Sequence, residues 1–206
     1  MKLFDYKNSS ASYRVRIALN LKGLCYQAQS ISLLDNEQGK DNYRALNPSG
    51  LVPTLVDNGQ VFTQSLAIIE YLEEAYPSPS ILPADRVARA RCRAIAMDIA
   101  CDIHPLNNLR VLQHLTGALH HSDDEKLQWY RHWVSIGLDA LEKKLESTQN
   151  TYCCDSIPTL ADICLVPQLF NARRFSIDLT PYPTLIEIEQ RCQALPEFAK
   201  AHPDNV

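Results

Sequence analysis

Three serines near the N-terminus, Ser9, Ser10 and Ser12, are the residues whose type and spacing point most directly to chemistry. They stand between a short apolar segment, residues 2–6, and a segment with helical periodicity, residues 13–22, so we expect them where a strand turns into a helix. The first N–H groups of a helix lack internal partners and carry partial positive charge, which favours a bound anion such as a thiolate. The same hydroxyls also suit an ordinary N-cap, so the spacing alone leaves both interpretations open.

The composition is that of a soluble globular protein. The chain has 206 residues, of which 46% are hydrophobic and 21% charged, and its formal net charge is -4. This balance does not favour wrapping nucleic acid or an anionic membrane, and no apolar stretch approaches the length of a membrane span. We therefore expect a cytoplasmic protein with no nucleic-acid or membrane partner.

The seven cysteines are odd in number and never form a Cys-x-x-Cys pair. This pattern argues against a disulfide framework, a zinc ribbon or a dithiol active site, and we expect no metal site. Cys101 and Cys164 lie in apolar helical patterns, which predicts that both are small core residues. His120 and His121 precede acidic residues, but a polar loop between helices explains them better than a metal site.

The first half alternates strand and helix patterns. A second strand is expected at 27–33, and the polar segment 35–47 predicts a loop with a short helix. Residues 51–56 and 60–63 flank Asp57, Asn58 and Gly59, the pattern of a hairpin, and an amphipathic helix follows at 66–74. Pro53 cannot donate to a sheet ladder, so it belongs at an edge or bend, where a cis bond would turn the Val52 backbone outward.

A proline-rich segment, residues 76–85, has the composition of an ordered linker and predicts a domain boundary. Beyond it we expect only helices, at 86–119, 124–147, 160–172 and 183–194. Thr159 and Asp162 have the spacing of a capping box at the start of the third of these helices. The fold class is therefore an α/β N-terminal domain, residues 1–80, followed by an all-α C-terminal domain, residues 86–206.

Several motifs occur together and in order. They are Ser-Ser-x-Ser-x-Arg-Val-Arg at 9–16, Val-Pro-Thr-Leu at 52–55 and Gln-Ser-Leu-Ala at 64–67. This combination resembles the zeta class of glutathione transferases, and the likeness continues at 102–109, 159–168, 171–175 and 178–183. The resemblance covers nearly the whole chain. It implies a thioredoxin-like glutathione-binding domain, an all-helical substrate-binding domain and a homodimer.

The resemblance also implies roles for individual residues. Ser9, Ser10 and Ser12 would lie around the glutathione sulfur, with Ser10 or Ser9 donating a hydrogen bond to the thiolate. The remaining residues implied to bind this cofactor are Gln38 at its glycyl end, Val52 through its backbone, Gln64 and Ser65 at its γ-glutamyl carboxylate, and His104 and Asn108.

The predicted helix 86–119 carries His104 and Asn108 four residues apart, which would place them on one face although Pro105 bends that helix. The resemblance implies that Arg174, Arg110 and His104 bind the substrate. A histidine in such a helix is also commonly a packed or solvated residue. The arginines between 86 and 93 are interpreted as a solvated or dimer-facing surface.

Two positions depart from the family pattern. Ala11 stands where a cysteine is common, which is tolerable because the nucleophile would be the glutathione sulfur. Asn8 stands where an arginine is common, which removes one candidate clamp for a dicarboxylate substrate.

The activity implied by the resemblance is glutathione-dependent cis–trans isomerisation, converting maleylacetoacetate to fumarylacetoacetate in tyrosine and phenylalanine catabolism. Maleylpyruvate is an alternative substrate, and a broader glutathione transferase acting on α-haloacids is a third possibility. A non-catalytic interaction protein with the same fold is the alternative from another class. A thiol reductase is disfavoured because no cysteine lies within residues 7–14.

Overall fold

The computed structural model describes residues 1–206 and divides into two compact units. Unit 1 contains Met1–Ile81 together with Gln193–Val206, and unit 2 contains Leu82–Cys192. The division falls between Ile81 and Leu82, inside the predicted linker at residues 76–85, and the predicted second domain, residues 86–206, includes the segment 193–206 that is grouped with unit 1. Residues 193–206 belong to unit 1 because the helix they contain packs on the first helix of the chain.

Unit 1 is built on a four-stranded sheet with strand order β2-β1-β3-β4. The strands are β1 (Lys2–Asp5), β2 (Gln27–Ser30), β3 (Thr54–Asp57) and β4 (Gln60–Thr63). The β1–β2 pair is parallel and the other pairs are antiparallel. The predicted hairpin is confirmed: Asn58 and Gly59 have φ values of 47° and 78°, the left-handed conformation that a two-residue hairpin turn requires.

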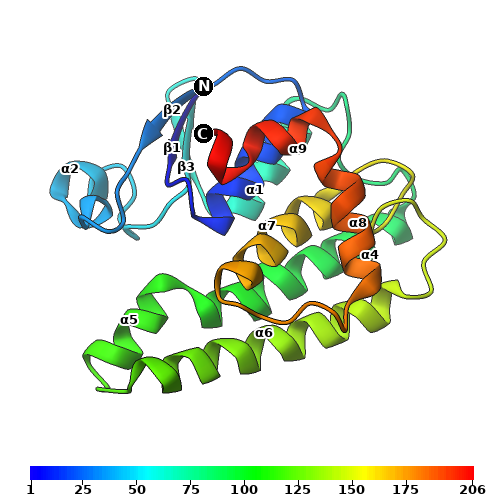
Figure 1. Ribbon diagram of the computed structural model, residues 1–206. Helices are drawn as coiled ribbons and strands as arrows, with labels where there is room; N and C mark the ends of the chain where they lie inside the picture. The colour runs from blue at the N-terminus through cyan, green and yellow to red at the C-terminus, as the bar shows by residue number, and fades with distance from the viewer. The chain divides into compact units, whose positions relative to one another are not determined.

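The helices of unit 1 are α1 (Ser10–Leu21), α2 (Asp41–Arg44), α3 (Ser65–Ala75) and α9 (Pro196–Ala201), with 3-10 turns at Glu37–Gly39 and Pro203–Asn205. Helix α9 lies alongside α1 (Figure 1). Helix α1 begins three residues before the predicted start because Ser9 is its N-cap. Gly23, with φ +64°, ends this helix as predicted, and its N–H donates to the Asn20 carbonyl at 2.9 Å.

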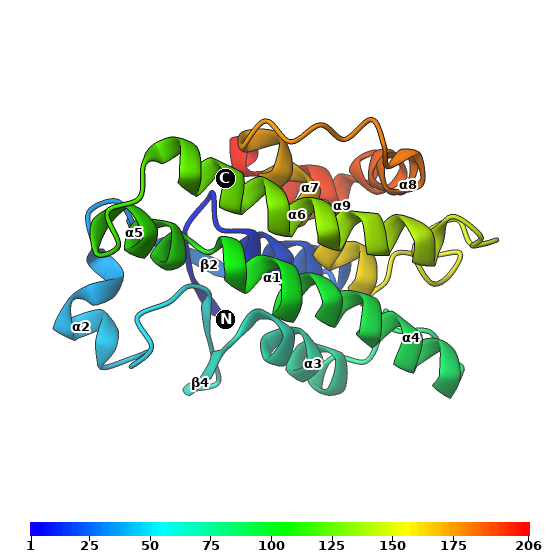
Figure 2. The same ribbon diagram turned by 90° about the horizontal axis from the view of Figure 1, so that it is seen from below.

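Unit 2 is entirely helical. Its elements are α4 (Arg86–Met97), a π-helical segment (Asp98–Ile103), a 3-10 turn (His104–Asn107), α5 (Leu109–Gly117), α6 (Asp123–Leu145), α7 (Leu160–Arg174) and α8 (Pro183–Gln193). Helices α5 and α6 run side by side (Figure 2). None of the helices in the chain is long and apolar enough to cross a membrane.

The expected single helix 86–119 is wrong, because the chain passes through π and 3-10 turns before α5 begins. Pro105 lacks the N–H that a continuing α-helix needs. The wider π turn also changes the direction of the side chains within it. Cys101 is therefore exposed rather than buried, whereas Cys164 is buried as predicted. The capping box of Thr159 and Asp162 is confirmed at the start of α7.

Gly137 on α6 makes room for the Ile103 side chain, since a Cβ atom at Gly137 would overlap it. Gly137→Ala therefore overpacks this contact at a cost of about 1–3 kcal/mol. The helix preference of alanine returns about 0.8–1.0 kcal/mol, so we expect the free energy of unfolding to fall by up to about 2 kcal/mol. Urea unfolding of the purified variant measures this loss.

Gly117→Ala is the matched control, because a Cβ at Gly117 meets no atom within 4 Å. We expect this substitution to raise the free energy of unfolding by up to about 1 kcal/mol. Equal effects of the two substitutions would contradict the contact between Gly137 and Ile103.

Candidate active site

Ser9 is the N-cap of α1, and its hydroxyl oxygen accepts a hydrogen bond from the Ser12 N–H at 3.2 Å. Acceptance of this bond leaves the Ser9 hydroxyl proton available for donation. Ser9 is half-buried, whereas Ser10 is 4% exposed and Ser12 is fully enclosed. Ser10 and Ser12 thus lie inside the helix rather than in the turn before it, and Ser9 is the most accessible of the three.

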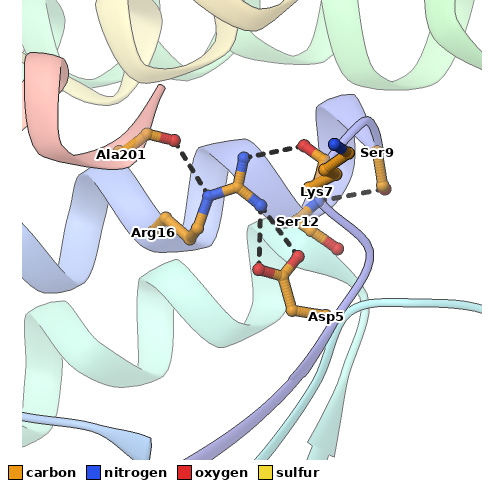
Figure 3. A network of polar contacts seen from close by, with 6 residues as sticks. All are labelled: Asp5, Lys7, Ser9, Ser12, Arg16 and Ala201. Carbon is orange, nitrogen blue, oxygen red and sulfur yellow. Dashed lines mark hydrogen bonds and ion pairs between the residues drawn. The ribbon is translucent and has the colours of Figure 1, made fainter. Parts of the chain in front are cut away.

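The turn that leads into α1 is held by a buried guanidinium (Figure 3). Arg16 is 1% exposed and donates from one nitrogen to both carboxylate oxygens of Asp5, at 2.8 and 2.9 Å. Its other nitrogens donate to the carbonyls of Lys7 at 3.0 Å and Ala201 at 2.9 Å. Arg16 therefore joins β1, the turn before Ser9 and the end of α9.

Val52 presents a backbone edge that the rest of the chain does not use. Its bond to Pro53 is cis, as considered from the sequence, and β3 pairing begins only at Thr54. No hydrogen bond joins the Val52 N–H or carbonyl to another residue. The loop before it is fixed, because Tyr43 and Asn47 both donate to the Leu51 carbonyl at 2.7 Å. The edge is therefore positioned and open to an extended peptide ligand.

Gln64 and Ser65 start α3 with free helical N–H groups. Gln64 has φ 68°, a left-handed value that a non-glycine residue seldom adopts, and its side chain makes no capping bond. The first turn contains no acidic side chain, so its positive end is not neutralised. This terminus has the charge and donors that suit a carboxylate.

Arg14 adds a second positive group at this place, one for which the sequence analysis gave no role. It is 1% exposed and donates to the Ser65 hydroxyl at 3.3 Å, which connects α1 with α3. The signal was present in the sequence, because Arg14 and Arg16 alternate with Val15 and Ile17 in a helix whose residues are almost all buried. Arginines in such a helix need partners, and those partners are at the candidate site.

Gln38 lies in the 3-10 turn Glu37–Gly39. Its amide nitrogen donates to the Asn36 side chain at 3.1 Å, while its buried amide oxygen has no partner. Gly50 permits the close approach of the neighbouring loop, since a Cβ there would lie 3.0 Å from the Gln38 carbonyl oxygen. Gln38 therefore offers an acceptor in a turn of defined position.

Within unit 2, His104 and Asn108 do not share one helix, which corrects the expectation from their spacing. His104 begins a 3-10 turn, and Asn108 is the N-cap of α5. The Asn108 side-chain oxygen accepts from the Arg110 N–H at 3.2 Å, so it serves a structural role. Arg110 itself is exposed in the first turn of α5.

Arg174 is the last residue of α7 and is exposed. It donates to the Asn171 side chain at 3.3 Å and lies over the Phe170 ring at 6.0 Å. Burial raises the pKa of the Tyr130 phenol, and the charge of Arg174 acts against that rise. The guanidinium thus lies next to the half-buried Phe170 and the buried Tyr130 while remaining open to solvent.

His120 and His121 lie in the loop between α5 and α6, as expected. No group of three or more His, Cys, Asp or Glu side chains in residues 1–206 is arranged to hold a metal ion.

Family models match both parts of the chain: the N-terminal domain of glutathione S-transferase at residues 3–80 and its C-terminal domain at residues 134–196. A probable maleylacetoacetate isomerase from Vibrio cholerae is 50% identical over 98% of this chain and 95% of its own. A holo maleylpyruvate isomerase structure, described as a bacterial zeta-class glutathione S-transferase, has a TM-score of 0.98 and 45% identity, covering 100% of this chain and 98% of its own.

A maleylacetoacetate isomerase from Methylobacterium extorquens AM1, solved with bound malonate and glutathione, has a TM-score of 0.97 and 37% identity, covering 100% of this chain and 98% of its own. The sequence match to the Vibrio cholerae relative extends over both units. The chain belongs to the zeta class of the glutathione S-transferase family.

Proposed function

We propose that this chain is a glutathione-dependent cis–trans isomerase that converts maleylacetoacetate to fumarylacetoacetate. The observation that carries the proposal is that unit 1 contains both an accessible Ser9 hydroxyl at the start of a helix and a Val52 backbone whose N–H and carbonyl make no hydrogen bond within the chain. The full-length similarity to a probable maleylacetoacetate isomerase supports the choice of reaction.

The residues of unit 1 fit the parts of glutathione. The Val52 backbone has both groups free to pair with the cysteinyl residue of the tripeptide. The first N–H groups of α3, the Ser65 hydroxyl and the buried charge of Arg14 suit the γ-glutamyl carboxylate. Gln64 precedes these groups at the helix start, and the unpartnered oxygen of Gln38 suits the glycyl N–H.

When bound, glutathione supplies a nucleophilic sulfur that adds reversibly to a conjugated double bond. In our proposal the Ser9 hydroxyl donates a hydrogen bond to that sulfur and so stabilises the thiolate. Lowering a thiol pKa from ~8.5 by about two units requires roughly 2.7 kcal/mol. A hydrogen bond to a charged acceptor contributes about 1.5–3 kcal/mol and the helix terminus about 0.3–1 kcal/mol, so the two together suffice.

Ser10 and Ser12 are less well placed than Ser9 to contact the sulfur. Ser10 is the alternative donor, although it is only 4% exposed. Ser12 is fully enclosed, so we assign it to the interior of α1 behind Ser9. We therefore propose that Ser9 contacts the sulfur before Ser10 or Ser12 is considered, and single substitutions of the three serines test this ranking.

In unit 2 we propose that Arg174 and Arg110 bind the carboxylates of the substrate, with His104 as a further donor. Negative charge builds up on the substrate carbonyl and carboxylates during addition, so cationic donors lower the barrier. Asn108 caps α5, and we propose that it supports Arg110 rather than binding glutathione directly.

The deciding experiment assays maleylacetoacetate and maleylpyruvate separately, each with and without glutathione. We expect turnover of maleylacetoacetate that requires glutathione and does not consume it. Arg174→Gln should lower kcat/KM by about 10- to 150-fold, because a hydrogen bond between charged groups contributes about 1.5–3 kcal/mol. Arg86→Gln is the control, since Arg86 is exposed at the start of α4 and should leave kcat/KM unchanged.

Each other outcome selects another function. Consumption of glutathione by α-haloacids without isomerisation would make the chain a transferase. Absence of both activities, with no binding to immobilised glutathione, would make it a non-catalytic protein. Isomerisation without glutathione would contradict the proposed cofactor.

Maleylpyruvate is the second candidate substrate, favoured by the TM-score of 0.98 to a maleylpyruvate isomerase. Both substrates are diacids with a cis double bond and need the same thiolate and cationic groups. The ratio of the two kcat/KM values decides between them.

We also propose a homodimer, as the family resemblance implies. Val87 and Met97 on α4 are 58% and 49% exposed, which leaves apolar area for a second copy. Light scattering of the purified protein should give twice the chain mass of 23.3 kDa, whereas a single chain mass would contradict the proposal.

A further inference from the structure

The last turn of α7 carries two neighbouring arginines whose side chains have different partners. Arg173 donates to both carboxylate oxygens of Glu189, to one of them at 2.5 Å, and Glu189 is 1% exposed. Arg174 donates instead to the side-chain oxygen of Asn171 at 3.3 Å. Arg173 is therefore held by a buried carboxylate, whereas the acceptor that Asn171 offers to Arg174 is neutral.

The spacing of residues along α7 explains these contacts of Arg174. Asn171 lies three residues before Arg174 and Phe170 lies four residues before it, and these are the spacings at which side chains of one helix meet. The central carbon of the guanidinium lies 6.0 Å from the centre of the Phe170 ring. Both contacts hold the guanidinium against its own helix.

The helix end that carries these residues is itself fixed. The Phe175 N–H donates to the backbone carbonyls of Asn171 and Ala172, at 3.3 and 3.2 Å. The Phe175 ring stacks on the Tyr130 ring of α6, with the ring centres 3.9 Å apart and the ring planes at 18°. Because Tyr130 is fully enclosed, this stack holds the end of α7 against α6. The position of Asn171 is therefore set by the packing of unit 2.

Asn171 differs from Arg174 in its exposure to solvent. Asn171 is 8% exposed, whereas Arg174 is exposed. The neighbours of an enclosed side chain restrict its rotamers, so the Asn171 oxygen accepts from a fixed direction. An amide oxygen accepts a hydrogen bond but carries no net charge, whereas a carboxylate in its place would form an ion pair with the guanidinium. Asn171 can therefore orient Arg174 without neutralising its charge.

We propose that Asn171 is a positioning residue, which holds the Arg174 guanidinium in the orientation that binds a carboxylate ligand and does so without neutralising its charge. This inference rests on the proposed function, in which Arg174 binds a carboxylate of the substrate. A flexible arginine loses rotamer freedom when it binds a ligand, and one that is already held loses less. Asn171 thus acts through Arg174 and does not itself contact the substrate.

The test measures, by calorimetry, the binding of malonate to the full-length protein saturated with glutathione. Malonate is a dicarboxylate without a carbon–carbon double bond, so the measurement does not depend on isomerisation. Asn171→Ala should weaken malonate binding by about 2- to 13-fold, which corresponds to immobilising one long side chain on binding. Asn171→Asp adds a negative charge that pairs with Arg174, and should weaken binding by about 10- to 150-fold, as loss of a hydrogen bond between charged groups does.

The order of the two variants separates positioning from a purely structural role. Aspartate keeps the shape of asparagine and an acceptor oxygen, so a structural role would leave Asn171→Asp close to the unmodified protein and make Asn171→Ala the weaker binder. The positioning role gives the opposite order. Asn150→Asp is the matched control, because it adds the same charge in the exposed loop before α7 and should leave malonate binding unchanged. Urea unfolding of each variant checks that the fold is kept.

Arg174→Gln, measured in the same way, separates this inference from the proposed function. Weaker malonate binding in Arg174→Gln, with unchanged binding in both Asn171 variants, would overturn the positioning role alone. The same holds if Asn171→Asp binds malonate more tightly than Asn171→Ala, or if Asn150→Asp weakens binding as much as Asn171→Asp does. Unchanged binding in Arg174→Gln, or no malonate binding by the unmodified protein, would overturn both the positioning role and the proposed role of Arg174.

Discussion

Arg16→Met should lower the free energy of unfolding by about 3–5 kcal/mol, because it leaves the Asp5 carboxylate buried without its partner. Arg16 and Asp5 are 1% and 6% exposed, so solvent cannot replace the lost bonds. The substitution also removes the donors to the carbonyls of Lys7 and Ala201, which join the turn before Ser9 to the end of α9. Urea unfolding, followed by circular dichroism, measures the change.

Two further variants test the reason for this loss. Arg16→Lys keeps the charge but cannot donate to all these acceptors at once, so an intermediate loss is expected. The double variant Arg16→Met/Asp5→Leu removes both charges and should recover a large part of the lost stability. If Arg16→Met unfolded at the same urea concentration as the unmodified protein, the buried ion pair would not hold this part of unit 1 together.

Ser9→Gly should raise the pKa of the bound glutathione thiol by about 1–2 units, because it removes a hydrogen bond worth about 1.5–3 kcal/mol to the thiolate. The same energy corresponds to a fall of about 10- to 150-fold in kcat/KM at neutral pH. Glycine is a tolerated N-cap that costs only a few tenths of a kcal/mol, so folding should be preserved. Ultraviolet absorbance of the thiolate, titrated with pH in the complex, gives the pKa.

The sign of the pH dependence is fixed by the role of the thiolate. The rate rises with pH as the thiol ionises, and a higher thiol pKa moves this rise to higher pH. The deficit of Ser9→Gly should therefore be largest at low pH and shrink at high pH. Ser9→Thr should restore the hydroxyl and most of the rate, and Ser12→Ala should leave the titration unchanged. An unaltered thiol pKa in Ser9→Gly, with a raised one in Ser10→Ala, would move the donor to Ser10.

Features set by local backbone preference were predictable from the sequence. Asn58 and Gly59 adopt the left-handed turn that their types favour, and Gly23 ends α1 for the same reason. Thr159 and Asp162 form the capping box that their spacing indicates. Each of these features depends on contacts within a few residues, so residue types at short spacing in the sequence are enough to predict it.

Features that depend on long-range burial were not predictable. The pairing of α9 with α1, which places residues 193–206 in unit 1, has no local signal. The exposure of Cys101 follows from π and 3-10 turns where periodicity indicated one helix. The buried partners of Arg14 and Arg16 lie 51 and 185 residues away along the chain, at Ser65 and Ala201.

The sequence by itself determined the family and the two-part architecture, because these are carried by residue types at short spacings. Only the tertiary structure decided which of the three serines is accessible and that the Val52 N–H and carbonyl make no hydrogen bond within the chain. Accessibility and contact depend on which distant segments cover a side chain, and burial of that kind is a property of the whole folded chain rather than of any short stretch of it.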